Sequence, residues 1–437
     1  MSTIDGWTRK LPHHWSTKPL KAIAWYLVSN VDKVPSGDEQ PVRLCNYTDV
    51  YNNEFISSDM DLMRTTATTT EIEKFRLLKN DVVITKDSES WDDIAIPSLI
   101  VDTADDILCG YHLAILRPKP EALNGRFLFR CLQSKSIRLQ LELSSTGVTR
   151  FGLPKGEIGK MLLPVASMDE QRRIADYLDR ETSQIDTLIK EKTHMLALIE
   201  EKRAALISRA VTRGLDPDAD LKPSGLPWLS DIPVQWETMQ LKRTWISAEY
   251  GISENIRNEG SIKVLRMTCI VDGKIDLTKA GEVEEVDESL LLRKGDLLFN
   301  RTNSLDQVAK VGLLEVEPEV PTSFASYLVR IRTNERTSGG YLTYLLNSSI
   351  FLEFARKNAI PAIGQANLNP TKYGEICIPL PPRQEQDEII NSITRERKKT
   401  SEMESTLILS IALLKERRSA LITSAVTGQL ELEAMNP

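Results

Sequence analysis

GWTRKLPHHW, the stretch at residues 6–15, recurs in altered form as PWLSDIPVQW at residues 227–236, a shift of 221 positions. A second set of echoes follows at a shift of 215, which places Glu170-Gln171 in register with Glu385-Gln386. The order of the repeated segments predicts a globule, a long helix, a second globule and a second long helix. A chain built as two similar halves is suited to reading two similar things.

The bulk composition is that of an ordinary globular protein. At 437 residues the length favours two or three domains, and 41% hydrophobic with 27% charged residues is typical of soluble proteins. No apolar run approaches a membrane span, and no secretory pattern opens the chain. The five scattered cysteines form no CxxC pair, so we expect a reducing cytoplasm without disulfides or a zinc ribbon. Four histidines leave little material for a metal site.

The net charge is −7, from 55 basic and 62 acidic residues. Free-standing nonspecific DNA binders are usually basic, because neutralising phosphates supplies most of their affinity. Either this chain does not bind nucleic acid, or it binds through local patches and depends on partners for much of the phosphate contact.

Two regions have the mixed pattern of small α+β globules, with short β-rich runs separated by turn residues. In the first, we expect strands at residues 41–45 and 81–85 and one amphipathic helix from Phe127 through Leu141. The second repeats this layout. Its expected elements are strands at 263–266 and 296–299 and a helix at 341–346.

Two long helices are predicted, at about residues 168–212 and 384–427, each without an internal Pro or Gly. Gly214 and Gly428 end them. The apolar residues have heptad spacing: Leu178, Ile185, Ile199 and Leu206 with Lys192 at the missing step, a parallel row of Ile174, Leu188 and Met195, and in the second helix Ile389, Ile393, Met403, Leu407, Leu414 and Leu421.

A helix that is apolar along one narrow seam needs a partner for it. The economical arrangement lets the first helix, a rod of roughly 65 Å, run from one globule to the other and the second return antiparallel to it. The alternative is that each seam packs on its own globule.

We therefore predict an α+β protein with two similar globules separated by two long antiparallel helices, an intrachain coiled coil with pseudo-twofold symmetry and both chain ends near the first globule. The predicted segments are 1–160 and 215–375 for the two globules and 161–214 and 376–437 for the long helices.

No catalytic motif is found. The string at residues 152–160 fails the phosphate-loop spacing, and we interpret it as a turn before a short strand. A methyltransferase would need a glycine-rich cofactor loop and an Asn/Asp-Pro-Pro-aromatic motif, and Asn369-Pro370-Thr371 lacks the second proline. The tryptophans at 7, 15, 228 and 236 are predicted to be buried anchors, and Glu170-Gln171 with its repeat is explained sufficiently by helix capping.

Two loops in each globule are candidates for contacting DNA, because amide, hydroxyl and cationic side chains can pair with base edges or phosphates. The alternative is that these polar loops are simply solvated. The functional interpretation is favoured because the strand before the loop is repeated in both globules while the loop residues after it differ, which suits two half-sites of different sequence. The candidates are Thr85, Lys86, Ser88, Thr149, Arg150 and Lys155 in the first globule, and Asn300, Arg301, Thr302, Asn303, Ser304, Gln365, Asn367 and Lys372 in the second.

The chain resembles the specificity (S) subunits of Type I restriction–modification systems over essentially its whole length. The segments that carry the likeness are 169–179, 201–216, 224–236, 381–386 and 425–428. Departures from the family are small: His14 in the first copy and Gln235 in the second flank the tryptophan where family members often carry His.

The resemblance implies a DNA-binding subunit without activity of its own, which reads a bipartite double-stranded target through two target-recognition domains. It implies two modification (methyltransferase) subunits and further restriction subunits as partners. S-adenosylmethionine, and ATP with Mg²⁺ for restriction, are expected in those partners and no cofactor in this chain. The helix pair is expected to set the half-site separation, about 10 bp for one turn. Two rivals remain: an interaction scaffold that holds two protein-binding globules, and a self-contained methyltransferase.

Overall fold

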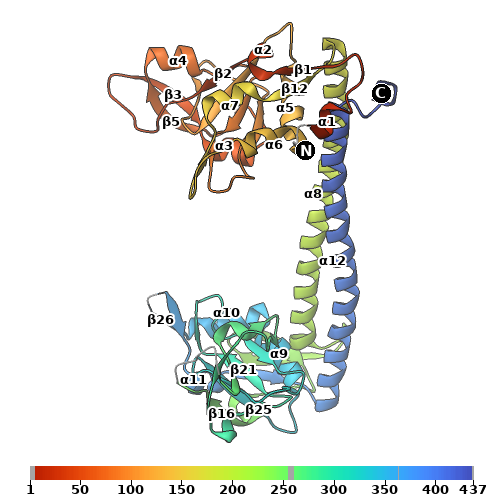
Figure 1. The fold of residues 1–437 in the computed structure, drawn as a ribbon. Coiled ribbons are helices and arrows are strands. Elements are labelled where there is room, and N and C mark those ends of the chain that lie inside the picture. Colours follow the sequence, from red (N-terminus) through yellow and green to blue (C-terminus); the bar gives the residue numbers. More distant parts are fainter. Residues whose placement is uncertain (1–4, 254–259, 363, 436–437) are drawn as a thin grey trace. The chain divides into compact units, whose positions relative to one another are not determined.

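The computed structural model describes residues 5–253, 260–362 and 364–435. The chain divides into two compact units. Unit 1 comprises Met1–Thr193 and Ile408–Pro437, and unit 2 comprises His194–Leu407. Each unit holds one globule together with parts of the two long helices, α8 (Met168–Arg213) and α12 (Arg383–Val426) (Figure 1). None of the described helices combines the length and apolar character that crossing a bilayer requires.

The globule of unit 1 is built on a five-stranded sheet of order β2-β10-β6-β8-β4 and a three-stranded sheet of order β5-β3-β9. Strand β1 pairs with β12, and β7 pairs with β11. The elements are α1 Asp5–Thr8, β1 Ser16–Pro19, α2 Leu20–Ile23, β2 Ala24–Val28, β3 Gln40–Cys45, α3 Tyr47–Asn52, β4 Phe55–Ile56, β5 Met63–Ala67, α4 Thr69–Phe75, β6 Val82–Thr85, β7 Asp87–Ser88, β8 Pro97–Ile100, β9 Ile107–Cys109, β10 Leu113–Pro118, α5 Gly125–Gln133, α6 Lys135–Leu143, β11 Phe151–Gly152, α7 Lys155–Lys160 and β12 Leu162–Val165.

The central strands of this globule are buried on both faces. Along β6, Val82 and Ile84 belong to one hydrophobic core and Val83 to another. Because successive side chains of a strand point to opposite faces, the sheet separates two cores. This explains why the run from Val82 to Ile84 is apolar without interruption and does not alternate with polar residues.

Unit 2 repeats the plan with a six-stranded sheet of order β16-β25-β21-β23-β19-β18. The three-stranded sheets are β20-β17-β24 and β22-β27-β26. The elements are β13 Leu221–Leu226, β14 Leu229–Pro233, β15 Glu237–Gln240, η1 Leu241–Thr244, β16 Trp245–Tyr250, β17 Ile262–Leu265, η2 Met267–Cys269, β18 Ile270–Val271, β19 Lys274–Ile275, β20 Ala280–Val283, η3 Glu288–Leu290, β21 Leu297–Asn300, β22 Thr302–Asn303, β23 Val311–Leu313, β24 Thr322–Phe324, β25 Leu328–Thr333, α9 Gly339–Leu346, α10 Ser349–Lys357, β26 Ile360–Ala362, β27 Gln365–Asn367, α11 Pro370–Glu375 and β28 Cys377–Leu380.

The structural repeat follows the sequence shift of 215 closely. Strands β9, β10 and β6 of unit 1 correspond residue for residue to β24, β25 and β21 of unit 2. The repeated aspartates that precede β6 and β21 have the same role in both units. Asp81 accepts hydrogen bonds from Arg117 Nε (2.9 Å) and from the backbone of Leu78, while Asp296 accepts from Arg332 Nε (2.7 Å) and from the backbone N–H of residue 293.

Two expectations for the first globule are corrected. The helix expected from Phe127 through Leu141 is two helices, α5 and α6, because Ser134 between them has the extended ψ of 114° that ends one helix and caps the next. The segment at 152–160, expected to be a turn, contains helix α7. Pro154 precedes α7 as its N-cap, and the buried Ile158 holds the helix to the core.

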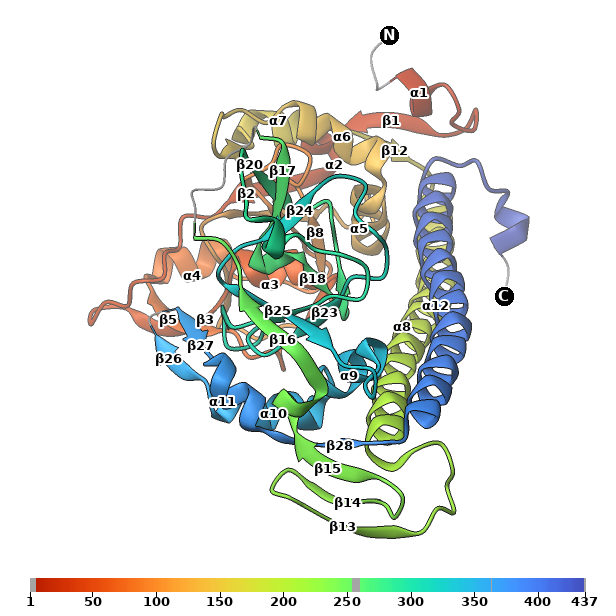
Figure 2. The ribbon, with the colours of Figure 1, turned by 90° about the horizontal axis from the view of Figure 1, so that it is seen from below.

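The two long helices contact each other in both units, and they lie side by side in both views (Figures 1 and 2). In unit 1, Arg418 of α12 pairs with Asp186 of α8 at 2.8 Å. In unit 2, Arg203 of α8 pairs with Glu404 of α12 at 3.1 Å. Between the first ion pair and the second, the residue number rises from 186 to 203 on α8 and falls from 418 to 404 on α12, as antiparallel helices require. The predicted antiparallel pair is confirmed.

The burial along the heptad rows differs from the expectation. Leu178 and Ile185 are buried, but Leu188, Met195 and Met403 are exposed. Leu178 packs in the main core of unit 1, so the globule covers part of the seam, as the alternative interpretation held. Beyond the globule a helix has a single neighbour, and two helices bury only a narrow strip between them.

The helices end where expected, and the strands beside them refine the segment limits. Gly214 and Gly428 adopt left-handed φ values of 77° and 66°, which terminate α8 and α12. The stretches 161–167 and 376–382, assigned to the helical segments, contain strands β12 and β28. The four-segment division itself stays a prediction.

The chain end returns to unit 1. The C-terminal 3₁₀ helix η4 is Leu432–Met435, and Arg173 of α8 donates a hydrogen bond to the carbonyl of Leu432 at 3.0 Å. Met435 is buried in the main core of that unit. The first and last described residues, Asp5 and Met435, both belong to unit 1, so for the described part of the chain both ends lie by the first globule, as expected.

Candidate nucleic-acid interface

In each globule the structure brings the two predicted loops together as one small sheet. In unit 1, β7 pairs with β11, with Asp87 opposite Gly152 and Ser88 opposite Phe151. In unit 2, β22 pairs with β27, with Thr302 opposite Asn367. Loops that are more than 60 residues apart in sequence therefore form a single surface, as a recognition site assembled from both would need.

The same backbone bond joins the loops in both units. The N–H of Leu153 donates to the carbonyl of Lys86 at 2.9 Å, and that of Leu368 donates to Arg301 at 2.8 Å. Leu153 and Lys86 correspond to Leu368 and Arg301 at the sequence shift of 215. The scaffold is thus duplicated while the side chains that it carries differ.

The predicted contact residues fall into three groups by exposure. Five are exposed: Thr149, Arg150, Lys155, Gln365 and Lys372. Five are half-buried: Lys86, Arg301, Asn303, Ser304 and Asn367. Four are buried: Thr85, Ser88, Asn300 and Thr302.

The four buried side chains belong to the scaffold, so the expectation that they contact DNA is not supported by their placement. Thr85 Oγ1 accepts a hydrogen bond from the backbone of Ile96 at 3.0 Å, and Ser88 Oγ accepts from Ser90 N at 3.2 Å. Asn300 donates to the carbonyl of Met267 at 3.3 Å, and Thr302 accepts from Asn367 at 2.9 Å. The sequence did not reveal the burial of Thr85 and Asn300 because each is the last residue of an otherwise apolar strand, β6 or β21. Ser88 and Thr302 lie in the short strands β7 and β22, which pair with segments far away in the sequence.

Lys155 and Lys372 lie apart from the small sheets, on helices α7 and α11. Asn369 caps α11, and its side-chain oxygen accepts from the N–H groups of Thr371 (2.8 Å) and Lys372 (3.3 Å). Any contact that these lysines make with DNA would thus come from a neighbouring helix.

The site of unit 1 is charged and contains a histidine that the sequence did not single out. Asp87 accepts from His112 Nδ1 at 2.6 Å and from Lys86 Nζ at 3.2 Å. The guanidinium of Arg150 lies 3.2 Å from His112 Nε2, and the Tyr111 ring lies 3.7 Å from the imidazole between centroids. No sequence signal marked Tyr111 and His112, since they fall in a turn between two other strands.

The site of unit 2 is built around Arg301. Its guanidinium lies over the ring of Tyr250 at 5.1 Å, donates to the carbonyl of Ser326 at 3.3 Å and lies 3.5 Å from Asn367 Oδ1. Its Nε is buried and has no hydrogen-bond partner among the described residues. Tyr250 and Tyr327 are about half-exposed beside it.

The Trp and Glu-Gln repeats fasten each globule to a long helix. All four tryptophans are buried, as predicted. Trp236 Nε1 donates to Glu385 at 2.9 Å, and Trp15 Nε1 donates to Glu170 at 3.4 Å. Capping is part of the explanation, since Glu170 also bonds the backbone of Ser167 at 2.9 Å. It is not sufficient, because the glutamates bind the tryptophans as well.

Glu170 makes the stability of unit 1 sensitive to acid. Burial would raise its pKa, but hydrogen bonds from His14, from the Ser167 side chain and backbone and from Trp15 outweigh it and lower the pKa to about 2. A depressed carboxyl pKa stabilises the fold above the unfolded value of 4.5, and this contribution is lost as the pH falls from about 4.5 towards 2.

We expect Glu170→Gln, which keeps the cap, to flatten the acid dependence of unit 1 stability by no more than about 3 kcal/mol. Hydrogen exchange of unit 1 peptides at several pH values between 5 and 2.5 (about the window above) would measure it. Asp169→Asn is the control, since that neighbouring carboxylate is almost fully exposed. Equal pH slopes for Glu170→Gln and the unmodified chain would contradict the prediction.

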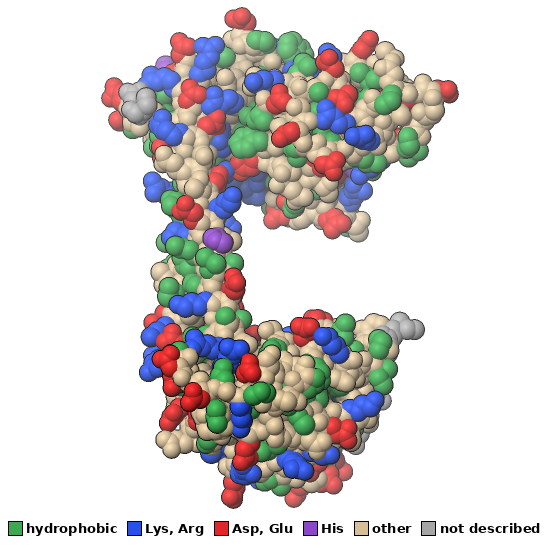
Figure 3. All heavy atoms as spheres, turned by 180° about the vertical axis from the view of Figure 1, so that it is seen from behind, with side chains coloured by type: hydrophobic (Ala, Val, Ile, Leu, Met, Phe, Trp, Pro, Cys, Tyr) green, Lys and Arg blue, Asp and Glu red, His purple; other side chains and the backbone are tan. Residues whose placement is uncertain are grey.

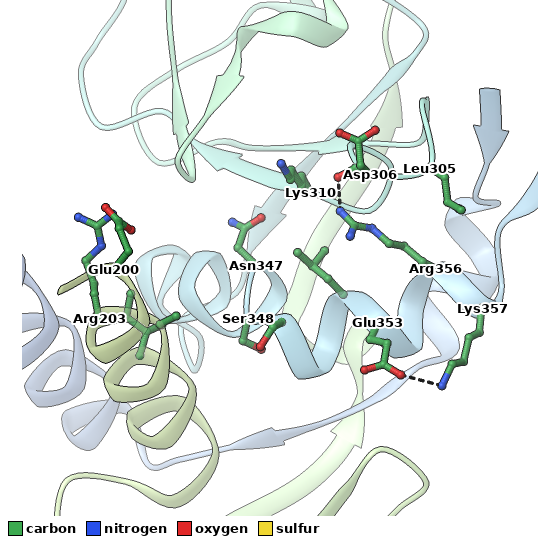
Figure 4. A pocket seen from close by; sticks show the side chains of 14 residues that line it. Glu200, Arg203, Leu305, Asp306, Lys310, Asn347, Ser348, Glu353, Arg356 and Lys357 are labelled. Atoms are coloured by element: carbon green, nitrogen blue, oxygen red, sulfur yellow. Dashed lines mark hydrogen bonds and ion pairs between the residues drawn. The ribbon is translucent and has the colours of Figure 1, made fainter. Parts of the chain in front are cut away.

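A hollow of about 1260 Å³ lies in unit 2 between α8 and α10 (Figure 4). Leu305 and Asp306, which follow strand β22, are among its lining residues. Its cations are bound to protein groups: Lys357 to Glu353 at 3.0 Å, Lys310 to Gln307 at 2.9 Å, Arg356 to the carbonyls of Asp306 and Val308, and Arg203 to Glu404.

Exposed apolar side chains line the helix pair beyond the globules (Figure 3). In unit 2 a groove of about 760 Å³ is lined by Met195, Leu198, Ile199, Lys399, Glu402, Met403, Thr406 and Leu407. Met403 and Leu198 are exposed in unit 2, and their equivalents at the shift of 215, Leu188 and Leu413, are exposed in unit 1. Each unit thus carries the same exposed apolar pair.

Comparisons with known proteins are consistent across the chain. A family model described as the Type I restriction modification DNA specificity domain matches residues 32–196. The putative type I restriction enzyme MjaX specificity subunit of Methanocaldococcus jannaschii is 30% identical over 171 residues, which span 37% of this chain and 39% of that one. The EcoKI specificity subunit of Escherichia coli K12 is 21% identical over 444 residues, with 98% of this chain and 92% of the relative covered.

Two solved structures share the fold. A chain from a study of assembly and conformational transition in a type I R-M system aligns with a TM-score of 0.71 at 15% identity, and covers 96% of this chain and 99% of the other. The HsdS subunit of Thermoanaerobacter tengcongensis aligns with a TM-score of 0.55 at 16% identity, and covers 96% and 98%.

Proposed function

We propose that the chain is a specificity subunit of a Type I restriction–modification system, like the relatives that it resembles, that it reads a two-part DNA sequence, one part with each globule, and that it carries no catalytic activity of its own. The observation that carries the proposal is the duplicated loop junction. Lys86 and Arg301 occupy equivalent backbone positions, and the side chains around them differ. A shared frame with different contacts suits two half-sites of unlike sequence.

Exposed and half-buried side chains at the junctions have the chemistry of groove readers. Arg150 and Lys86 in unit 1 suit the acceptor-rich edge of guanine, while Asn303 and Gln365 in unit 2 suit adenine or a phosphate. The net charge of −7 supports a complex in which this chain contacts the bases and its partner subunits supply much of the contact with the phosphates.

Two modification subunits are the partners that we propose for the helix pair. The exposed apolar pair Leu188 and Leu413 of unit 1 repeats as Met403 and Leu198 of unit 2. Exposed apolar patches of this kind mark interaction sites, and two equivalent patches suit two copies of one partner. These partners would use S-adenosylmethionine to methylate an adenine in each half, and restriction subunits with ATP and Mg²⁺ would join them.

Mapping of methyl-adenine across the host genome tests the proposal. We expect a two-part methylated motif that vanishes when this chain is deleted and returns when it is restored. The purified chain alone, given S-adenosylmethionine and DNA that contains the motif, should transfer no methyl group. Persistence of the motif after deletion would contradict the specificity role, and methyl transfer by the isolated chain would contradict the non-catalytic one.

A further inference from the structure

A third segment meets the two recognition loops in each globule. It is the turn between β9 and β10 in unit 1, residues 110–112, and the turn between β24 and β25 in unit 2, residues 325–327. The N–H of Lys86 donates to the carbonyl of His112 at 2.8 Å, and the N–H of Arg301 donates to that of Tyr327 at 3.1 Å. The turn is therefore fastened to the same point of the recognition surface in both units.

We propose, building on the function proposed above, that this turn is the third recognition segment of each globule and that His112 and Tyr327 are specificity-determining residues, one for each half-site. The two positions are equivalent, because Tyr327 follows His112 at the sequence shift of 215. They carry different ring side chains on the same backbone frame. The imidazole holds the guanidinium of Arg150 at the surface, whereas the half-exposed phenol is itself available to a base, so the equivalent positions would select different base pairs.

In unit 1 the contacts of His112 orient it toward the exposed Arg150. Nδ1 donates to Asp87 at 2.6 Å, and the Arg150 guanidinium lies beside the imidazole, 3.2 Å from Nε2 and 3.3 Å from Nδ1. The Tyr111 ring, at 3.7 Å, covers one side of the imidazole. Asp87, His112 and Arg150 thus form a chain that holds a guanidinium at the surface, which suits the O6 and N7 acceptors of guanine.

In unit 2 the corresponding turn, residues 325–327, is held in place by Arg301. Arg301 donates to the carbonyl of Ser326 at 3.3 Å and stacks over Tyr250 at 5.1 Å, which fixes the backbone that presents Tyr327. The side chain of Tyr327 is 48% exposed. A phenol that is half-exposed on a fixed backbone offers one hydroxyl for a base edge and a ring face for apolar contact, such as a thymine methyl.

The test uses the complete complex of this chain with its modification subunits and a duplex library randomised in both half-sites. We expect His112→Ala to reduce the preference for one base pair, a G·C pair, by about tenfold in one half-site only. Tyr327→Ala should act at one position of the other half-site to a similar extent. His112→Gln and Tyr327→Phe alter the hydrogen bonding with less change of shape, and each should affect the same position as its alanine variant.

Two exposed residues outside the recognition surface serve as controls, His13→Ala in unit 1 and Val316→Ala in unit 2, and neither should change any preference. An unchanged motif in all four turn variants, with the unmodified chain still selecting two half-sites, would overturn this inference alone. Equal loss at every position of both half-sites would overturn it too, because it would indicate a structural role. An unmodified complex that selects no motif would instead contradict the proposed function.

Discussion

Replacement of Trp236 by alanine is expected to destabilise unit 2 by about 3–5 kcal/mol, the range for a large aromatic removed from a packed core. Trp236 is fully buried, packs edge-on against Tyr341 at 6.4 Å and donates to Glu385 at 2.9 Å. Tyr341 in turn donates to the carbonyls of Val211 on α8 (3.0 Å) and Pro379 on β28 (3.2 Å). The indole therefore supports the point where both long helices meet the globule.

Native-state hydrogen exchange is the suitable measurement, because a chain with two compact units need not unfold in one transition. Peptides of the second globule should lose protection while those of the first keep it. Trp25→Ala is the matched control, since Trp25 is 52% exposed, and its effect should stay below about 1 kcal/mol. If Trp236→Ala destabilised unit 2 by less than about 1 kcal/mol, Trp236 would not be needed to anchor the globule to the helices.

Replacement of Gln386 by leucine is expected to have an effect of similar size, about 3 kcal/mol or more, although the volume hardly changes. The Gln386 side chain is fully buried at the start of α12. It accepts from Ser338 N at 2.8 Å and donates to the carbonyls of Arg336 (3.0 Å) and Pro381 (2.9 Å). Leucine would leave three backbone groups without partners, at about 1–3 kcal/mol for each one that stays buried.

The chain supplies its own controls for this prediction. Gln384→Leu changes an exposed glutamine two residues earlier on the same helix and should alter stability by no more than about 0.5 kcal/mol. Gln171 has the same three kinds of bond in unit 1, to Asn124 N (2.8 Å) and to the carbonyls of Ala166 (2.9 Å) and Ala122 (3.3 Å). Gln171→Leu should therefore loosen unit 1 and leave unit 2 unchanged. Equal protection in the Gln386 and Gln384 variants would refute the explanation.

The repeat, the long helices and the anchors were predictable from the sequence, because each depends on spacing along the chain. Heptad spacing without Pro or Gly predicts a long helix, and Gly214 and Gly428 end the two helices. The shift of 215 between Glu170-Gln171 and its repeat predicted equivalent structures, and the structure contains them. Local rules are sufficient for such features.

The break at Ser134 and the helix α7 were not predictable, since tertiary packing overrode weak local preferences there. The candidate site was only half predictable for a related reason. The two loops were identified by their polar residues, but burial decides which of those residues face water, and it removed Thr85, Ser88, Asn300 and Thr302 from the surface.

The sequence by itself determined that the chain is a duplicated α+β protein with two long helices, because repetition and periodicity are properties of order along the chain. Only the tertiary structure decided that Lys86, Arg150 and His112 share one surface, and Arg301, Asn367 and Tyr327 another. The physical reason is that strand pairing joins segments far apart in sequence, and no local pattern encodes which turn will lie beside which loop.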